Sequence, residues 1–153
     1  MFSFFRKLLN HDGNVSTAPV IVVAFLFVAG TVTFLGMEEN TPEKRLTQVS
    51  SVEFAETVIA EDDITLIDVR TAKEYSTGHL PGAINIDYRA DSFKNTISDL
   101  EPTSRYAIYC RSGNRSRDVL NVMREKGFIW VIDLSGGIEA LSANTEAMGS
   151  FGY

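Results

Sequence analysis

The sequence predicts an α/β domain with a largely parallel central sheet, helices on both faces, and one transmembrane helix in front of it. From residue 51 onward, short apolar runs rich in β-branched residues alternate with amphipathic segments. Short apolar strands separated by helices are typical of a parallel sheet that is buried on both faces. A chain of 153 residues has room for one such domain. Residues 15–37, which contain no charged side chain, require a separate interpretation.

The segment 15–37 is uncharged. At about 1.5 Å of rise per residue, a helix of this length can cross the hydrocarbon core of a bilayer, which is about 30 Å thick. We therefore expect an N-terminal flank (1–14), a membrane anchor (15–37) and a polar tether (38–45). A cleaved signal peptide is the alternative, but its apolar region is normally shorter and is closed by small residues. The expected localisation is a single-pass membrane protein with its domain on the extracytoplasmic side, or a periplasmic form if the segment is cleaved.

The rest of the chain divides into a domain (46–143) and a C-terminal tail (144–153). A helix is expected over 51–60, capped by Ser50 or Ser51, because its apolar residues recur at helical spacing. The other elements follow from short β-branched runs, amphipathic segments and Gly or Pro boundaries. These are strands over 64–69, 83–86, 106–110 and 129–134, and helices over 71–79, 91–100, 116–126 and 138–144.

The single cysteine, Cys110, lies at the end of a predicted strand, where ligands bind in folds of this kind. Three arginines follow it within seven residues, although the chain has a formal net charge of -6: Arg111, Arg115 and Arg117. A tight strand-to-helix loop with Gly113 would direct backbone N–H groups inward and stabilise a thiolate. The thiolate is the nucleophilic form of cysteine, so Cys110 is a candidate for covalent catalysis.

A buried structural cysteine is the alternative interpretation of Cys110. Other function classes are excluded by residue counts. One cysteine cannot form a C-x-x-C redox couple, and one cysteine with two histidines cannot supply a usual zinc site. The sequence has no nucleotide-binding glycine loop, and an acidic chain is a poor candidate for nucleic-acid binding. We expect no metal and no organic cofactor.

Four segments occur in the order and rough spacing of a rhodanese domain: LIDVR (66–70), EYSTGHLPGAINI (74–86), IYCRSGNRS (108–116) and LSGGI (134–138). The chain resembles this family over about residues 46–143, so the resemblance implies a rhodanese-like fold. In the family, the cysteine takes a sulfane sulfur from a donor such as thiosulfate, holds it as a persulfide, and passes it to cyanide or a thiol.

Carried to this chain, the resemblance implies that Cys110 bears the persulfide and that the loop from Arg111 to Ser116 cradles it. Arg111 and Arg115 would bind the anionic donor, and Ser116 would start the next helix and orient the loop. Ser112, Gly113 and Asn114 complete this loop. Asp68 and Arg70 resemble a family pair near the loop and would have a supporting role, unless they form an ordinary ion pair at the strand end. His79 belongs to the segment GHLPGA, for which the resemblance implies a structural role.

Arg115 follows Cys110 after four residues, a C-x4-R spacing, whereas phosphatases that resemble rhodaneses have C-x5-R. The shorter loop suits a sulfur atom better than a phosphoryl group, so a phosphatase or arsenate-reductase-like activity is the weaker enzymatic alternative. A sulfur carrier or protein-docking module without turnover is the alternative from another class. The chain also departs from the family pattern at Leu141, where an aromatic residue is expected.

Overall fold

The structure is a computed structural model that describes residues 25–28, 31–34 and 43–152. Two units are described separately, residues 1–41 and residues 42–153. In the first unit, strands β1 (Phe25–Val28) and β2 (Thr31–Phe34) pair antiparallel, with Phe25 opposite Phe34 and Val28 opposite Thr31.

The prediction of a membrane-spanning helix over residues 15–37 is wrong where this segment is described, because residues 25–28 and 31–34 form strands. Their sequences, FLFV and TVTF, are rich in β-branched and aromatic residues, which favour strands over helices. The remainder of the predicted span lies outside the described residues. Within the described part of the chain, every helix is too short or too polar to cross a bilayer. The same finding on the helices contradicts the predicted localisation as a single-pass membrane protein with an extracytoplasmic domain.

The second unit contains a five-stranded, entirely parallel sheet in the order β3-β7-β6-β4-β5. The strands are β3 (Arg45–Val49), β4 (Ile64–Asp68), β5 (Ile84–Asn85), β6 (Arg105–Tyr109) and β7 (Trp130–Leu134). The predicted parallel α/β sheet is therefore confirmed, with β6 at its centre. The edge strand β3 was not predicted, because its residues RLTQV include two consecutive polar side chains, do not alternate, and continue the polar tether.

Six helices belong to this unit in the described residues: α1 (Ser51–Ala60), α2 (Ala72–Ser76), α3 (Phe93–Ser98), α4 (Asn114–Glu125), α5 (Gly137–Ser142) and α6 (Thr145–Ser150). Ser50 caps α1 by accepting a hydrogen bond from the Glu53 N–H. α6 was not predicted; Asn144 caps it, and it packs against α1 and α5.

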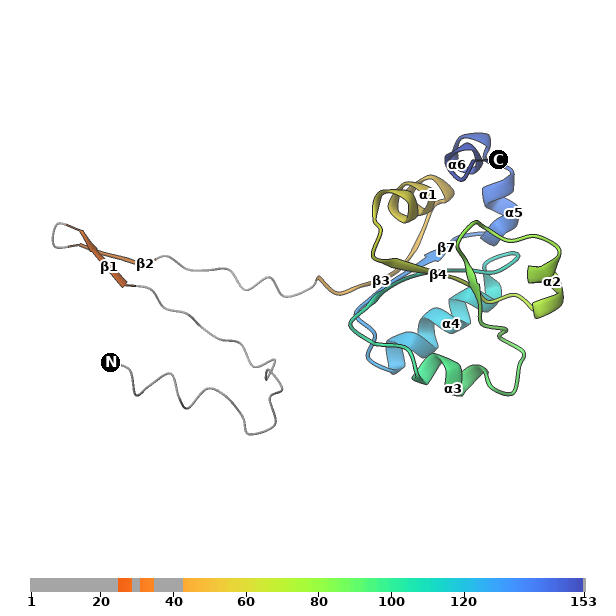
Figure 1. Ribbon diagram of the computed structural model, residues 1–153, viewed down its shortest axis with the longest axis horizontal. Coiled ribbons are helices and arrows are strands. Elements are labelled where there is room, and N and C mark those ends of the chain that lie inside the picture. Colours follow the sequence, from red (N-terminus) through yellow and green to blue (C-terminus); the bar gives the residue numbers. More distant parts are fainter. Residues whose placement is uncertain (1–24, 29–30, 35–42, 153) are drawn as a thin grey trace. The chain divides into compact units, whose positions relative to one another are not determined.

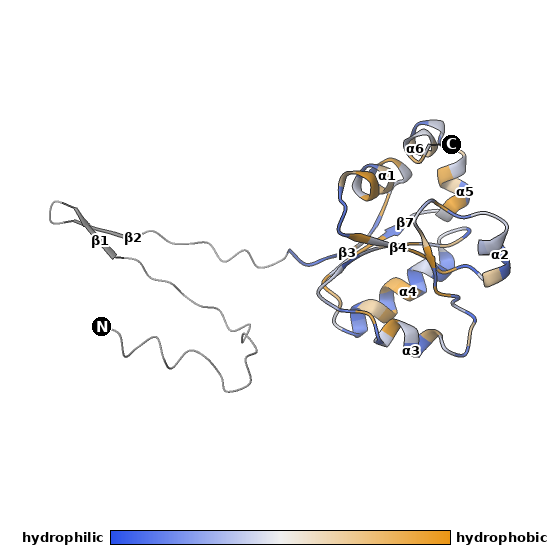
Figure 2. Ribbon diagram, viewed as in Figure 1, coloured by the Kyte–Doolittle hydropathy of each residue, from blue (hydrophilic) through white to orange (hydrophobic). Residues whose placement is uncertain are grey.

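The helices form a layer on each face of the sheet (Figure 1). α1, α5 and α6 bury apolar side chains in one core, which includes Phe54, Leu141 and Ala147. α3 and α4 fill the other core with Phe93, Ile97, Val119, Leu120 and Met123. Figure 2 shows that hydrophobic residues concentrate on the central strands, whereas α4 carries hydrophilic residues along much of its length. Leu141, in place of the expected aromatic residue, is fully buried and fills the α5 side of its core.

Candidate active site

Cys110 directly follows the central strand β6 and precedes α4, so the loop between them lies at the carboxyl edge of the sheet. Gly113 occupies the N-cap position of α4 with a φ of 85°, a left-handed conformation that glycine adopts without strain. This conformation turns the chain sharply enough to bring the loop's N–H groups back over the cysteine. The sequence-predicted strand, tight loop and helix are all present, and α4 begins two residues earlier than expected.

The Cys110 thiol lies inside this loop, with the residue only 1% exposed. Its Sγ accepts a hydrogen bond from the Gly113 N–H at 3.1 Å and another from the Ser116 hydroxyl at 3.5 Å. Burial raises the pKa of the Cys110 thiol, but the hydrogen bonds from the Ser116 hydroxyl and from the N–H groups of Ser116, Ser112 and Gly113 outweigh it. The net effect lowers the pKa from its ordinary value of 9.0. The loop therefore favours the nucleophilic thiolate.

The backbone at Gly136 and Gly137, where α5 begins, packs against the loop that follows Cys110. The N–H of Ile138 donates to the Cys110 carbonyl at 2.9 Å, and the N–H of Glu139 donates to the Arg111 carbonyl at 3.1 Å. This approach leaves no space for a side chain, because a Cβ at Gly137 would lie 2.5 Å from the carbonyl oxygens of Cys110 and Arg111. The motif LSGGI, which sequence analysis recorded only as a family feature, thus provides backbone support for the loop.

The two arginines expected to bind the donor each have a carboxylate partner. The Arg115 guanidinium donates to both oxygens of Glu74 at 2.8 Å, and the Arg115 side chain is 18% exposed. This pairing raises the pKa of Arg115, although burial opposes the change. Arg111 is exposed, and its Nε donates to Glu139 at 2.7 Å. Arg115 is therefore held in place as part of the site, whereas Arg111 is free to exchange its partner in solvent.

Glu74, the partner of Arg115 in the candidate site, was not predicted from the sequence. It is the N3 residue of α2 and forms a capping box with Thr71, whose hydroxyl accepts from the Glu74 N–H. The hydrogen bonds from Arg115 lower the pKa of Glu74 far below its ordinary value, despite partial burial. The T-x-x-E pattern could have revealed the cap, but its arginine partner is 41 residues away in sequence.

Asp68 and Arg70 form a buried, bidentate ion pair at the end of β4, with Arg70 Nη2 and Asp68 Oδ2 at 2.7 Å. Arg70 also donates to the Gly78 carbonyl at 2.6 Å, so the pair anchors the loop that follows α2. Among the described residues, neither side chain hydrogen-bonds to Cys110 or to the 111–116 loop. The Arg70 guanidinium lies 5.8 Å from the ring centroid of Tyr109, the residue before Cys110. Arg70 also lies close enough to Glu74 for the carboxylate to favour its charged form.

The remaining predicted residues divide between surface and core. Ser112 and Asn114 are exposed at the outer side of the loop, and Gly113 and Ser116 are buried. His79, expected to be structural, stacks on the Tyr75 ring with the ring centroids 3.7 Å apart. Sequence analysis also missed Asp133 on β7, a fully buried acid close to Ser116. Only its position beside the LSGGI motif could have drawn attention to it.

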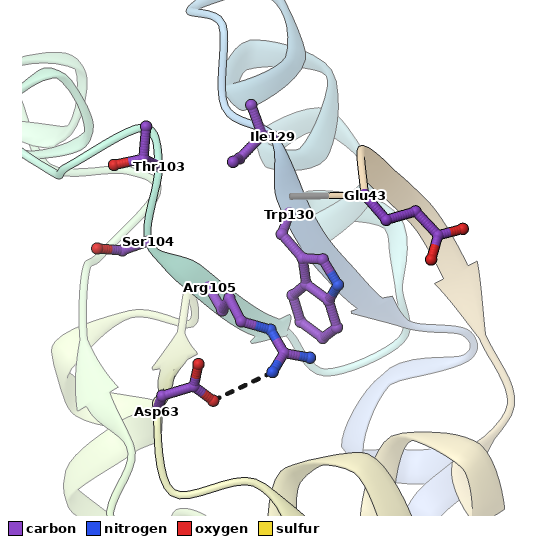
Figure 3. A pocket seen from close by; sticks show the side chains of 7 residues that line it. All are labelled: Glu43, Asp63, Thr103, Ser104, Arg105, Ile129 and Trp130. Atoms are coloured by element: carbon purple, nitrogen blue, oxygen red, sulfur yellow. Dashed lines mark hydrogen bonds and ion pairs between the residues drawn. The ribbon is translucent and has the colours of Figure 1, made fainter. Parts of the chain in front are cut away.

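A separate pocket of about 470 Å³ opens at the other edge of the sheet, where β6 and β7 begin (Figure 3). There Arg105 stacks over the Trp130 ring at 4.0 Å from its centroid and pairs with Glu61 and Asp63. The pocket is lined by Glu43, Asp63, Thr103, Ser104, Arg105, Ile129 and Trp130. None of these residues belongs to the predicted site, because the strands run away from this pocket toward Cys110.

Comparison with known proteins places this arrangement in a family. The rhodanese-like domain family matches residues 51–144. A putative sulfurtransferase of Bacillus subtilis, YtwF, is 30% identical over 99 residues, which span 65% of this chain and 93% of that protein. A putative sulfur carrier protein of the same organism, YrkF, is 27% identical over 111 residues, 72% of this chain and 59% of that protein. The structure of a rhodanese-related protein from Thermoplasma volcanium aligns with a TM-score of 0.55 at 25% identity, covering 63% of this chain and 91% of that one. This chain belongs to the rhodanese-like domain family.

Proposed function

We propose that this protein is a sulfurtransferase that moves sulfane sulfur from an anionic donor, such as thiosulfate, to a thiol or cyanide through a persulfide on Cys110. The observation that carries the proposal is the cradle around Cys110, in which N–H and hydroxyl donors converge on one sulfur atom and lower its pKa. The relatives named sulfurtransferases support the same class of reaction.

The reaction takes place in two transfers. In the first, the Cys110 thiolate attacks the sulfane sulfur of thiosulfate, an S–S bond forms to Cys110, and the bond to the sulfonate breaks to release sulfite. In the second, cyanide or a thiolate attacks the outer sulfur of the persulfide, and the electrons of the S–S bond return to Cys110 as its thiolate. Neither transfer requires a metal or an organic cofactor. The donors that stabilise the thiolate would equally stabilise the persulfide anion.

The other predicted residues have roles that follow from their contacts. Arg111, exposed at the mouth of the loop, would exchange Glu139 for the sulfonate group of the donor. Arg115 would add positive potential while Glu74 holds it in position. Ser116 would orient the loop through its hydrogen bond to the thiol. Asp68 and Arg70 would support the site indirectly, by fixing Gly78 in the segment that follows α2, the helix that carries Glu74.

A sulfur carrier that holds the persulfide without small-molecule turnover is the second candidate. The relative YrkF, named a putative sulfur carrier protein, favours it. So does the 1% exposure of Cys110, because a deeply placed sulfur is accessible to fewer acceptors. A phosphatase activity is less compatible with the loop, because the four residues between Cys110 and Arg115 enclose a single sulfur atom and the N–H groups already point at it.

The test is to incubate the full chain with thiosulfate and measure both its intact mass and thiocyanate formation after cyanide is added. Because the chain has one cysteine, a gain of one sulfur atom can be assigned to Cys110, and it should vanish in Cys110→Ser. The transferase proposal predicts the adduct together with repeated turnover. An adduct with a single release would favour the carrier, and hydrolysis of an aryl phosphate without any adduct would overturn both.

A further inference from the structure

Asp133 is a buried acid on the same face of the sheet as the Cys110 side chain. It lies on β7 opposite Ile108 of β6, and Ile108 and Cys110 belong to the core that α4 covers. Asp133 is 0% exposed, as is Ser116 in the first turn of α4. An acid in such a position must be either paired or neutral, because a carboxylate with unsatisfied oxygens is costly to bury.

The two carboxyl oxygens of Asp133 have different surroundings. Oδ2 accepts a hydrogen bond from the Gln48 side chain at 2.7 Å. Oδ1 is buried and, among the described residues, has no hydrogen-bond partner. The Ser116 side chain is near enough to the Asp133 carboxyl to favour its charged form. The Ser116 hydroxyl also donates a hydrogen bond to Cys110 Sγ. Ser116 is thus close to both the Asp133 carboxyl group and the Cys110 thiol.

We propose that Asp133 is a positioning residue that shares one proton with Cys110 through the Ser116 hydroxyl. In one state, Cys110 carries the proton and Asp133 is a carboxylate that accepts from Ser116. In the other state, Asp133 Oδ1 carries the proton and donates to Ser116 Oγ, while Ser116 donates to the Cys110 thiolate. This inference rests on the proposed role of Cys110 for its functional consequence.

The interconversion balances within the three residues. The S–H proton passes to Ser116 Oγ, the Ser116 O–H proton passes to Asp133 Oδ1, and the negative charge moves from carboxylate to thiolate. No proton enters from solvent and no other reactant is needed. In either state Ser116 would be the hydrogen-bond partner of Oδ1, which has none among the described residues. The thiolate is therefore formed without a water molecule entering the loop.

The groups around Asp133 are compatible with a protonated carboxyl. From β3 it faces only the neutral amide of Gln48, and from α4 it faces Ser116 and the charge of Arg117. Cys110, which follows β6, is the hydrogen-bond acceptor of this same Ser116 hydroxyl. Burial raises the pKa of Asp133 more than Ser116, Gln48 and Arg117 lower it. Asp133 can therefore hold a proton at a pH where exposed aspartates cannot.

The test measures thiolate formation in the full chain by ultraviolet absorbance as the pH is raised. Cys110→Ser is titrated in the same way, and its curve is subtracted to remove the absorbance of ionised tyrosines. Coupled groups release their protons in two steps, so the wild-type thiolate should form over a broad pH range. Asp133→Asn is neutral at every pH and removes the competing negative charge. We expect a single step in this variant, with its midpoint lower by about one pH unit.

Asp118→Asn is the matched control, because Asp118 is exposed on the same helix and its loss removes the same charge. Its titration should coincide with that of the wild type. An Asp133→Asn curve that coincides with the wild-type curve, or shifts to higher pH, would overturn the proposal. If Asp133→Asn does not fold, Ser116→Ala tests the same connection: the two steps should merge into one, and an unchanged two-step curve would overturn it.

These readouts do not depend on sulfur transfer. A protein that shows the coupled titration but takes no sulfur from thiosulfate would retain this inference and lose the proposed function. A protein that forms the persulfide normally, with a thiolate titration unaffected by Asp133→Asn, would show the reverse. Alkylation by iodoacetamide, measured over the same pH range, provides a second measure of thiolate content.

Discussion

Arg115 and Glu74 form a bidentate ion pair that joins the segment after Cys110 to α2. The two terminal nitrogens of Arg115 each donate to a different Glu74 oxygen at 2.8 Å. Glu74 also closes the capping box with Thr71, so one carboxylate both starts α2 and positions a loop arginine. The pair thus transmits the position of α2 to the residues that surround Cys110.

Glu74→Gln should lower the free energy of unfolding by about 1 kcal/mol at neutral pH, because glutamine preserves the cap but not the charge. The pKa of Glu74 is lowered in the folded state, so the wild-type contribution is complete above its ordinary value of 4.5 and declines as the pH falls below that value. Urea titrations at several pH values would measure this. The difference between the two proteins should shrink below pH 4.5, and a constant difference would contradict the assignment.

Gly137→Ala should destabilise the protein by about 2–3 kcal/mol and abolish sulfur loading, because the new Cβ would overlap the loop backbone. The clash is with the carbonyls of Cys110 and Arg111 at 2.5 Å, and Gly137 has a φ of 63°. Thermal unfolding and the persulfide mass would be measured together. Gly149→Ala in α6 is the control, since no atom lies within 4 Å of its new Cβ. If both variants load sulfur equally, the support from Gly137 is not required.

Breaking the Asp68–Arg70 pair on one side should cost about 3–5 kcal/mol, because it leaves one buried charge without its partner. Asp68→Leu and Arg70→Met are the two single variants, and the double variant that combines them removes both charges. We expect the double variant to lose less stability than the sum of the two single losses, as determined by chemical unfolding. Strict additivity would contradict a direct interaction. Retention of persulfide formation by the double variant would limit this pair to a structural role.

Cys110 should react with iodoacetamide at a lower pH in the folded protein than in the unfolded chain. Its pKa is lowered from 9.0, because hydrogen bonds from Ser116, Ser112 and Gly113 outweigh the opposing effect of burial. The pH at half-maximal alkylation should therefore lie below 9.0, and urea should move it upward. Because the pKa of Cys110 is lower in the folded protein, ionisation of this thiol increases the free energy of unfolding as the pH rises. The increase is complete once the pH exceeds the pKa of Cys110 in the unfolded chain. Equal midpoints in the two states would contradict the cradle.

The parallel sheet and most of the elements in residues 51–142 could be predicted from local patterns. The apolar runs that form β4, β6 and β7 are short and contain β-branched or aromatic residues, and α4 follows an amphipathic period that ends at Gly127. β3 and α6 were missed, because an edge strand and a terminal helix carry too few apolar residues to produce a clear period. The predicted membrane helix is wrong over residues 25–28 and 31–34, because apolar content alone does not separate a helix from strands rich in Val, Thr and Phe.

The sequence alone determined the α/β class, the position of Cys110 at a strand end and the short loop that surrounds its thiol, because period, loop length and glycine placement are local properties. Only the tertiary structure decided that Arg115 is paired with Glu74, that Gly137 lies against the loop backbone, and that Asp133 is close to Ser116. Each of these contacts joins elements that are far apart along the chain. Their partners are therefore selected by how the helices pack on the sheet, which no local pattern encodes.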